Sequence, residues 1–212
     1  MTVEVRFISL DVDSDRYLAF LSPDECHRAA RFRFDVHRNR YIVCRGTLRE
    51  LLGAKLGIDP AELRFEYGSH GKPRTANSQI TFNVSHSDVV AMIATAKDFE
   101  VGCDVEKVEP KFADDQIPER FFSPHEVAEL RALPKAEQTA AFFRCWTRKE
   151  AFIKACGLGV SMGLDTFDVT LGEPAMLLRG ADGWTLQAVA APEGYMAAVV
   201  ARGEFTIVRA PK

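Results

Sequence analysis

The order of structural signals along this chain repeats, and the repeat limits the possible folds more than any other feature. Residues 22–25 and 123–126 both read Ser-Pro-x-Glu. Each has the form of a capping box, with a serine N-cap, proline at the first helical position and a closing glutamate. A longer helical pattern follows each box, from Arg40 and from Ala141. The spacing predicts two similar α+β halves that meet near residue 100.

Strand patterns follow the helices in the same order in each half. Alternating segments surround Phe65 and Val169, and apolar segments span residues 89–96 and 195–201. The alternative, that the shared order arises by chance, stays open at this point. If the repeat is real, the protein has a pseudo-twofold arrangement of halves 1–100 and 101–212, and the cleft between them is the natural place for a ligand.

Composition is that of an ordinary globular protein, with 212 residues, 47% hydrophobic and 27% charged. The formal net charge of −3 argues against general attraction to nucleic acid or to an anionic membrane. The first residues alternate like a strand and lack the features of a signal peptide, and no segment is apolar over the length needed to span a bilayer. Five cysteines, an odd number without a CxxC pair, predict buried free thiols in a reducing cytoplasm.

The segment VGCDVEKVEP at residues 101–110 alternates with period two, which predicts a half-buried strand. Asp104 and Glu106 then point the same way. Two neighbouring carboxylates repel each other, so they form either a solvated sheet face or a site for a cation.

A third carboxylate, Glu150, falls on the apolar arc of the helical pattern that begins at Ala141. Lys154 stands one turn later, so a simple helix ion pair is one interpretation. Considered with Asp104 and Glu106, however, Glu150 completes an oxygen cage for a hard divalent cation. Magnesium fits best, because it is usually held by few carboxylates and a phosphate-bearing substrate.

Groups suited to binding phosphate occur in the first half. The segment CHRAARFRFDVHRNR carries a basic run, comprising Arg28, Arg31, Arg33, Arg38 and Arg40. Arginine grips phosphate oxygens by paired hydrogen bonds, although such runs are often only solvated surface. Lys72 lies in a Gly-Lys-Pro loop, where Pro73 fixes the chain just after the lysine.

The segment TFNVSHSDVV predicts a short strand at residues 81–84, a second strand from residue 89, and polar groups between them. Ser85 beside His86 suggests a hydrolase nucleophile, but adjacent side chains on a strand diverge and the G-x-S-x-G elbow is absent. We interpret both side chains as hydrogen-bond donors to a phosphate. A polar turn that closes a hairpin is the alternative.

Taken in chain order, five segments resemble one family, namely GKP (71–73), NVSHS (83–87), VGCDVEKVEP (101–110), RFFSPHE (120–126) and WTRKEAFIKACG (146–157). The chain resembles a phosphopantetheinyl transferase of the larger, surfactin-synthetase-activating class. That family's pattern is N-x-S-H-S, then G-x-D-x-E, then W-x-x-K-E-x-x-x-K, and each element is present. The resemblance covers essentially the whole chain and is weakest after Leu171.

The resemblance implies a pseudo-dimeric, monomeric enzyme with coenzyme A bound between the halves. Such enzymes, of the holo-[acyl-carrier-protein] synthase type, transfer the 4′-phosphopantetheine arm to a serine of an acyl, peptidyl or aryl carrier protein. Adenosine 3′,5′-bisphosphate is released. Carriers of fatty-acid, polyketide and nonribosomal-peptide synthesis are all candidate partners, and exposed arginines such as Arg33 or Arg120 are candidates for docking them.

The resemblance also implies residue roles. Asp104, Glu106 and Glu150 would hold magnesium, and Lys154 would contact the pyrophosphate near the reacting bond. Glu150 is the candidate general base, with Glu106 as its competitor.

The remaining implied contacts are to coenzyme A phosphates. Lys72, within the loop that includes Pro73, and Arg28 would meet the adenosine 3′-phosphate, with Arg31 close to Arg28. Ser85 and His86 would contact phosphates.

Two rival functions use the same features. A magnesium-dependent phosphohydrolase or nucleotidyl enzyme would keep the carboxylates and use water as the nucleophile. A non-catalytic binding module would not need all three acids, so their presence argues against it.

Overall fold

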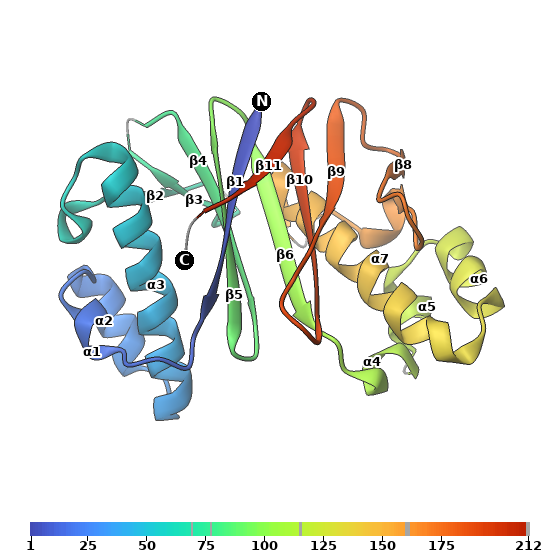
Figure 1. Ribbon diagram of the computed structural model, residues 1–212, viewed down its shortest axis with the longest axis horizontal. Coiled ribbons are helices and arrows are strands. Elements are labelled where there is room, and N and C mark those ends of the chain that lie inside the picture. The colour runs from blue at the N-terminus through green and yellow to red at the C-terminus, as the bar shows by residue number, and fades with distance from the viewer. Residues whose placement is uncertain (69, 77, 115, 160–161, 211–212) are drawn as a thin grey trace.

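The computed structural model describes residues 1–68, 70–76, 78–114, 116–159 and 162–210. Two sheets face each other in the middle of the molecule, and helices cover their outer faces (Figure 1). The side chains between the sheets form one apolar core, which includes Val3 and Met92 from one sheet and Cys103 and Val199 from the other. Among the described helices, none combines the length and apolar character needed to cross a membrane.

The first sheet contains β1 (Thr2–Ser9), β4 (Ile80–Ser87), β5 (Val90–Lys97) and β11 (Thr206–Arg209). Its order is β11-β1-β5-β4, with β11 parallel to β1 and the other pairs antiparallel. The last strand of the chain therefore joins the sheet of the N-terminal half. The outer face is covered by α1 (Asp15–Leu18), α2 (Pro23–Ala30) and α3 (Asp35–Leu56).

The second sheet contains β6 (Val101–Lys107), β9 (Trp184–Val189) and β10 (Tyr195–Arg202) in the antiparallel order β6-β10-β9. Its helices are α4 (Pro110–Asp114), α5 (Ile117–Phe121), α6 (Pro124–Ala132) and α7 (Lys135–Cys156). Helix α7 packs across β6 and β10. An aromatic cluster that includes Phe142 and Phe152 fills the space around it.

A short 3₁₀ turn and a two-stranded hairpin follow the long helix in each half. In the first half these are Pro60–Glu62 (η1), β2 (Phe65–Tyr67) and β3 (Pro73–Thr75). In the second half they are Leu164–Thr166 (η3), β7 (Asp168–Val169) and β8 (Leu177–Arg179).

The elements expected from the sequence are present, and the two long helices match each other closely. Both α3 and α7 contain 22 residues, and both begin a few residues before the expected start. Each ends at a glycine in the left-handed region, Gly57 at φ 67° and Gly157 at φ 68°. Glycine is favoured there because it has no Cβ to clash. The sheet orders β1-β5-β4 and β6-β10-β9 also correspond.

The five cysteines are free, as expected, but their predicted burial is only partly correct. Cys103 and Cys145 are buried, Cys44 and Cys156 are half-buried, and Cys26 is exposed. Cys26 lies on the face of α2 that points away from the core. The local apolar pattern of the sequence did not show which face of this short helix is buried.

The prediction of a half-buried β6 is wrong, because helix α7 covers the face that was expected to meet solvent. Val101, Cys103 and Val105 face the first sheet. On the other face Gly102 and Asp104 are buried too. Period-two alternation reveals which side chains share a face, but not what covers that face.

Gly102 allows the close approach of α7 to β6. A Cβ at this position would lie 2.2 Å from the carbonyl oxygen of Ala151 and 2.2 Å from the backbone nitrogen of Ala155. These are backbone atoms of a rigid helix, so no side-chain rotation would relieve the clash. Glycine at this point therefore sets the distance between α7 and the strand that carries Asp104 and Glu106.

We expect Gly102→Ala to lower the free energy of unfolding by at least about 2 kcal/mol, because the helix must move away from the strand. Gly172→Ala is the matched control, since a Cβ there meets nothing within 4 Å, and we expect a change within about 0.5 kcal/mol. Urea denaturation of both variants measures the difference. Equal stabilities would show that α7 does not pack as tightly as described.

Candidate active site

The two sheets meet along a seam where the edge strands β4 and β6 lie side by side. Side chains of β4 bridge to the backbone of β6. The Cys103 amide donates to Asn83 Oδ1 at 3.0 Å, and the Lys107 amide donates to Ser87 Oγ at 3.1 Å. Strand β4 is therefore longer than the predicted 81–84, because its polar residues find partners across the seam. The turn begins only at Asp88.

Ser85, Asp104 and Lys154 form the centre of this seam. Ser85 Oγ donates to Asp104 Oδ1 at 2.7 Å, and Lys154 Nζ donates to the same oxygen at 2.6 Å and to Ser85 Oγ at 2.9 Å. Asp104 is 1% exposed. Burial lowers the pKa of Lys154, but the Asp104 carboxylate, together with Cys103 and Glu150, raises it above its usual value, so the ammonium stays charged. Three elements, β4, β6 and α7, thus supply one polar cluster.

Glu106 and Glu150 add further negative charge beside this cluster. Ser87 Oγ donates to Glu106 Oε2 at 2.7 Å. Burial, and then repulsion from Asp104, raise the pKa of Glu106. The same two causes, in the same order, raise the pKa of Glu150, while Lys154 opposes them. Lys154 is one cation among three carboxylates, so the cluster carries an excess of acidic groups.

The predicted magnesium ligands are only partly assembled. Across the part of the chain that the structure describes, no group of three or more His, Cys, Asp or Glu side chains is placed to hold a metal ion. Lys154 Nζ instead donates a hydrogen bond to Oδ1 of Asp104. The other oxygen, Oδ2, is buried without a hydrogen-bond partner among the described residues. A buried carboxylate oxygen left in this way fits a hard cation in its donor chemistry.

A cavity of about 510 Å³ lies between α2, α3 and β4 in the N-terminal half. Its lining includes Arg28, Pro73 and His86 from the predicted set. The other lining residues are Leu10, Phe32, His37, Arg40, Tyr41, Cys44, Arg45, Leu48, Asn83, Val84 and Asp88. A neighbouring open hollow shares Arg28 and adds Arg31. Ser85 bonds to Asp104 while His86 lines the cavity, which agrees with the expected divergence of adjacent strand side chains.

Two of the three arginines that line the cavity are already neutralised. Arg40 pairs with Asp11 and Asp88, and Arg45 pairs with Glu25. The guanidinium of Arg28 lies 5.4 Å from the centre of the Tyr41 ring, and within the described ranges it has no carboxylate partner. Arg28 is therefore the arginine in this cavity that is available to an anionic ligand.

Lys72 lies apart from the cavity lining. Its Nζ donates to Glu100 Oε2 at 2.7 Å, to the Ala155 carbonyl at 3.0 Å and to the Val101 carbonyl at 3.2 Å. The Ala155 carbonyl belongs to the last turn of α7, where a cation is favourable. The structure thus uses Lys72 to join the Gly-Lys-Pro loop to the second half. Its contact with a phosphate stays a prediction.

Sequence reasoning missed several residues of the site. Ser87 shares a face of β4 with Ser85, and period two could have identified it. Tyr41, Arg45 and Leu48 line the cavity at the i, i+4, i+7 spacing of one helical face. That spacing was present in the sequence, but nothing local indicated that a cavity would lie opposite it.

Comparisons with known proteins agree with the motifs. The model of the 4′-phosphopantetheinyl transferase superfamily matches residues 100–200, and that of the 4′-phosphopantetheinyl transferase N-terminal region matches residues 11–98. The 4′-phosphopantetheinyl transferase HetI of Nostoc sp. is 40% identical over 87% of this chain and 80% of its own length. The 4′-phosphopantetheinyl transferase Sfp of Bacillus subtilis is 33% identical over 75% of this chain and 70% of its own length.

The chain therefore belongs to the 4′-phosphopantetheinyl transferase superfamily. This family uses coenzyme A as its substrate and acts on carrier protein domains. The predicted resemblance is confirmed, and the family favours the transferase over the phosphohydrolase interpretation.

We expect Lys72→Met to lower the free energy of unfolding by about 1.5–3 kcal/mol, because it removes a largely buried, charge-assisted set of hydrogen bonds. Arg74→Met is the matched control: Arg74 approaches the same Glu100 at 3.6 Å, but its side chain is 68% exposed, against 12% for Lys72. We expect the control to change stability by less than about 0.5 kcal/mol. Thermal and urea denaturation distinguish the two. Equal losses would mean that Lys72 does not join the halves.

Proposed function

We propose that this protein is a magnesium-dependent enzyme of the holo-[acyl-carrier-protein] synthase type. It transfers the 4′-phosphopantetheine arm of coenzyme A to a serine of an acyl, peptidyl or aryl carrier protein. The observation that carries the proposal is the Ser85–Asp104–Lys154 cluster, which joins the two sheets beside a cavity lined by arginine and aromatic side chains.

The proposed arrangement is a pseudo-twofold pair of halves, residues 1–100 and 101–212, with the active site in the cleft between them. Its support is the corresponding sheet order, the paired 22-residue helices and the paired hairpins. In this arrangement the first half binds the nucleotide end of coenzyme A, and the second supplies the catalytic groups. Strand β11, from the second half of the chain, pairs with β1 and ties the halves together.

Coenzyme A would lie with its nucleotide in the cavity of the first half. The cavity volume falls within the range of about 300–1,000 Å³ that is typical of small-molecule sites. Arg28 would bind the adenosine 3′-phosphate, with Arg31 beside it and Pro73 in the wall. Lys72 would join this contact only by leaving Glu100 and the end of α7.

The pyrophosphate would then reach the seam, where Ser85 and Lys154 bind its oxygens. Burial, and then Lys154, lower the pKa of His86, so at neutral pH its imidazole is uncharged and acts as a hydrogen-bonding group. Donors held in place by the fold need no reorganisation during the reaction.

The reaction is an in-line displacement at the β-phosphorus of coenzyme A. A bond forms from the carrier serine oxygen to this phosphorus, the bond to the bridging pyrophosphate oxygen breaks, and adenosine 3′,5′-bisphosphate departs. Glu150 takes the serine proton, and Glu106 is the alternative base. Their raised pKa values bring both carboxylates closer to the strength that a base needs near neutral pH. Lys154 offsets charge on the leaving group.

Magnesium held by Asp104, Glu106 and Glu150 would supply charge neutralisation for the pyrophosphate. The support for this ion is the buried Oδ2 of Asp104, which has no hydrogen-bond partner among the residues that the structure describes, and the excess of carboxylates around one lysine.

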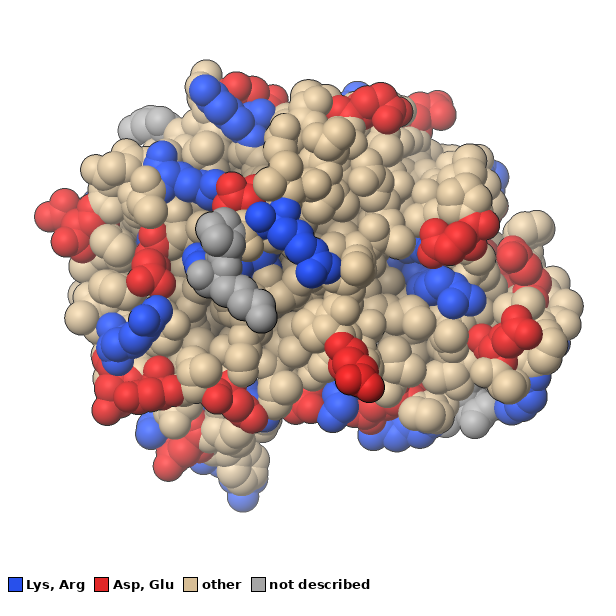
Figure 2. All heavy atoms as spheres, in the orientation of Figure 1, with Lys and Arg blue, Asp and Glu red and all other residues tan. Residues whose placement is uncertain are grey.

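We further propose that the protein acts as a monomer, because one chain would contain both halves of the site. The cytoplasm is the proposed location, because its reducing conditions suit five free cysteines. Carriers of fatty-acid, polyketide or nonribosomal-peptide synthesis are acidic, and exposed basic side chains such as Arg33 and Arg120 would meet them. Acidic and basic side chains are mixed over the face displayed in Figure 2, so docking would use local charges rather than one large basic surface.

The transferase is tested by incubating the protein with magnesium, coenzyme A and several apo carrier proteins. We expect mass spectrometry to detect one phosphopantetheine arm per carrier, and a carrier with alanine at the acceptor serine to stay unmodified. A parallel reaction without carrier separates the alternatives, because a phosphohydrolase would release adenosine 3′,5′-bisphosphate there. Absence of transfer to every carrier would contradict the proposal.

Metal dependence is tested with Asp104→Asn. Asparagine keeps an acceptor for Ser85 and Lys154, so we expect a folded protein, but it removes the charge that a cation needs. Transfer should fall by at least about 100-fold, as on loss of a major transition-state charge contact. Calorimetric titration should detect magnesium binding to the wild type and none to the variant, and chelation should stop wild-type transfer. The same substitution at an exposed position, Asp98→Asn, is the control and should leave transfer unchanged. Wild-type activity in Asp104→Asn would exclude the proposed metal site.

A further inference from the structure

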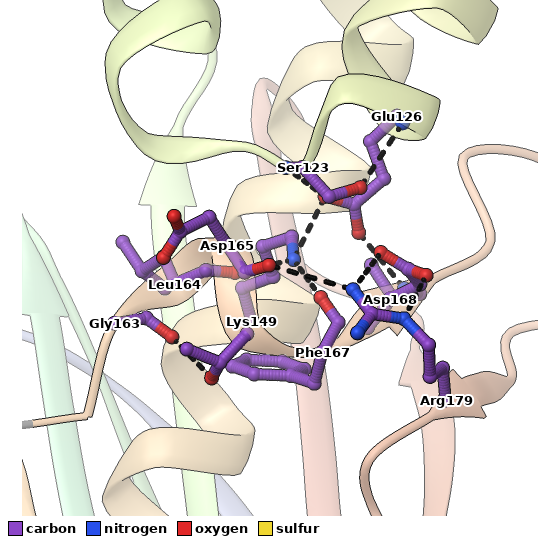
Figure 3. Close-up of polar contacts among 11 residues, drawn as sticks. Ser123, Glu126, Lys149, Gly163, Leu164, Asp165, Phe167, Asp168 and Arg179 are labelled. Carbon is purple, nitrogen blue, oxygen red and sulfur yellow. Dashed lines mark hydrogen bonds and ion pairs between the residues drawn. The ribbon is translucent and has the colours of Figure 1, made fainter.

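Lys149, the first lysine of the W-x-x-K-E-x-x-x-K segment, lies inside the protein. Figure 3 shows its side chain among residues of α6, η3 and β7. It is 0% exposed, and its Nζ is 2.8 Å from Glu126 Oε2. It donates to the carbonyl oxygens of Leu164 and Phe167, both at 2.6 Å, and lies 4.3 Å from the centre of the Phe167 ring. The ammonium group is fully engaged by protein atoms.

Glu126, the partner of Lys149, is also 0% exposed and fully engaged. Its Oε2 accepts from the Ser123 amide and its Oε1 accepts from the Val169 amide, both at 2.9 Å. The pair therefore connects the start of α6, the middle of α7, the turn η3 and strand β7. Figure 3 shows these segments converging on Lys149, with the Asp168–Arg179 ion pair beside them.

Lys149 faces a different side of α7 from the catalytic groups. At about 100° per residue, Lys154 lies about 140° around the helix from Lys149. Lys154 reaches β6 and Asp104, whereas Lys149 reaches η3 and α6. The helix is thus held from two sides, by Gly102 and Asp104 on one and by the buried pair on the other.

The first half contains an equivalent buried pair. Arg49 is 1% exposed, and its Nε donates to Glu25 Oε2 at 2.6 Å. Its Nη1 donates to the carbonyls of Pro60, the first residue of η1, at 2.6 Å and of Leu63, which follows η1, at 3.1 Å. Its guanidinium lies 5.2 Å from the centre of the Phe65 ring.

Glu25 repeats the capping role of Glu126. It accepts from the Ser22 amide at 3.0 Å at the start of α2, and it also pairs with Arg45 of the cavity wall. Each half therefore has a capping glutamate, a buried cation from its long helix, and the same kinds of carbonyl and ring contacts.

From this correspondence we infer that Lys149 and Arg49 are positioning residues with separate tasks, an inference that rests on the proposed function. Lys149 fixes α7 against α6 and η3, and so sets where Glu150 and Lys154 lie relative to β6. Arg49 fixes α2 against α3, and so sets the wall of the cavity that carries Arg28 and Arg45. Lys149 therefore determines the rate of transfer, and Arg49 determines the affinity for coenzyme A.

The test compares two variants, each of which removes one cation without leaving its glutamate buried and unpaired. Glu126→Gln with Lys149→Met removes both charges of the second pair. In the first half Arg49→Met is sufficient, because Glu25 keeps its ion pair with Arg45. We expect the Lys149 double variant to lower kcat for carrier modification about tenfold or more, with the KM for coenzyme A within twofold of wild type, since small misplacements of catalytic groups are costly. Arg49→Met should raise that KM about tenfold and leave kcat within twofold.

Exchange of the two cations provides rescue. Lys149→Arg and Arg49→Lys keep the charge, and each places in one half the cation used by the other. We expect each exchange to lower kcat/KM less than removal of the same cation does, because the charge and the ion pair with the glutamate survive. Circular dichroism establishes that all variants are folded.

Two readouts do not depend on transfer. Calorimetry should detect weaker coenzyme A binding only in Arg49→Met. Hydrogen exchange should quicken in α7 and residues 164–169 only in the Lys149 double variant, and in α3 and residues 60–65 only in Arg49→Met. Folded variants with unchanged kcat, KM and exchange, or with the same change in both, would overturn the inference. If wild-type protein modified no carrier, the proposed function would fail, and calorimetry and exchange would still decide whether the two pairs have separate tasks.

Discussion

The buried carboxylate of Asp104 is the interaction on which the rest of the site depends. Removing a carboxylate from water costs several kcal/mol unless charged and polar partners replace the solvent. Here Lys154 comes from α7 and Ser85 from β4, so the compensation requires two sheets and a helix to meet at one point. Gly102 makes that meeting sterically possible, because any side chain there would strike the backbone of α7. The polar centre of the site is therefore also the joint of the fold.

This joint carries more negative than positive charge, and the neighbouring cavity carries the opposite excess. The raised pKa values of Glu106 and Glu150 reflect burial first and then crowding with Asp104. The cavity presents Arg28 without a carboxylate partner among the described residues. A polyanionic substrate accompanied by a divalent cation would relieve both imbalances together. Neither the negative excess at the seam nor the positive excess in the cavity stabilises the fold. We therefore attribute both to binding and catalysis.

The sequence predicted those features that depend on local periodicity. Capping boxes and helical arcs identified the long helices, and alternation placed Asp104 and Glu106 on one face. It could not predict what covers that face, so β6 was expected to be half-exposed. The sequence could not show the structural contacts of Lys72 and Lys149 either, because their partners are distant along the chain. Lys149 donates to carbonyl oxygens of residues 164 and 167, and Lys72 donates to that of Ala155. Contacts set by how loops return to a helix leave no periodic signal.

The two halves share one structural framework but present different functional side chains. In each half a capping glutamate is buried against a cation of the long helix, which fixes a short helix, a long helix and the following turn as one unit. A framework fixed in this way can vary the side chains on its free faces without losing its geometry. The first half presents arginines and aromatic rings toward a cavity, and the second presents Glu150 and Lys154 toward the seam. The proposed division of binding and chemistry between the halves then depends on which face of each long helix meets β4 and β6, rather than on any difference in fold.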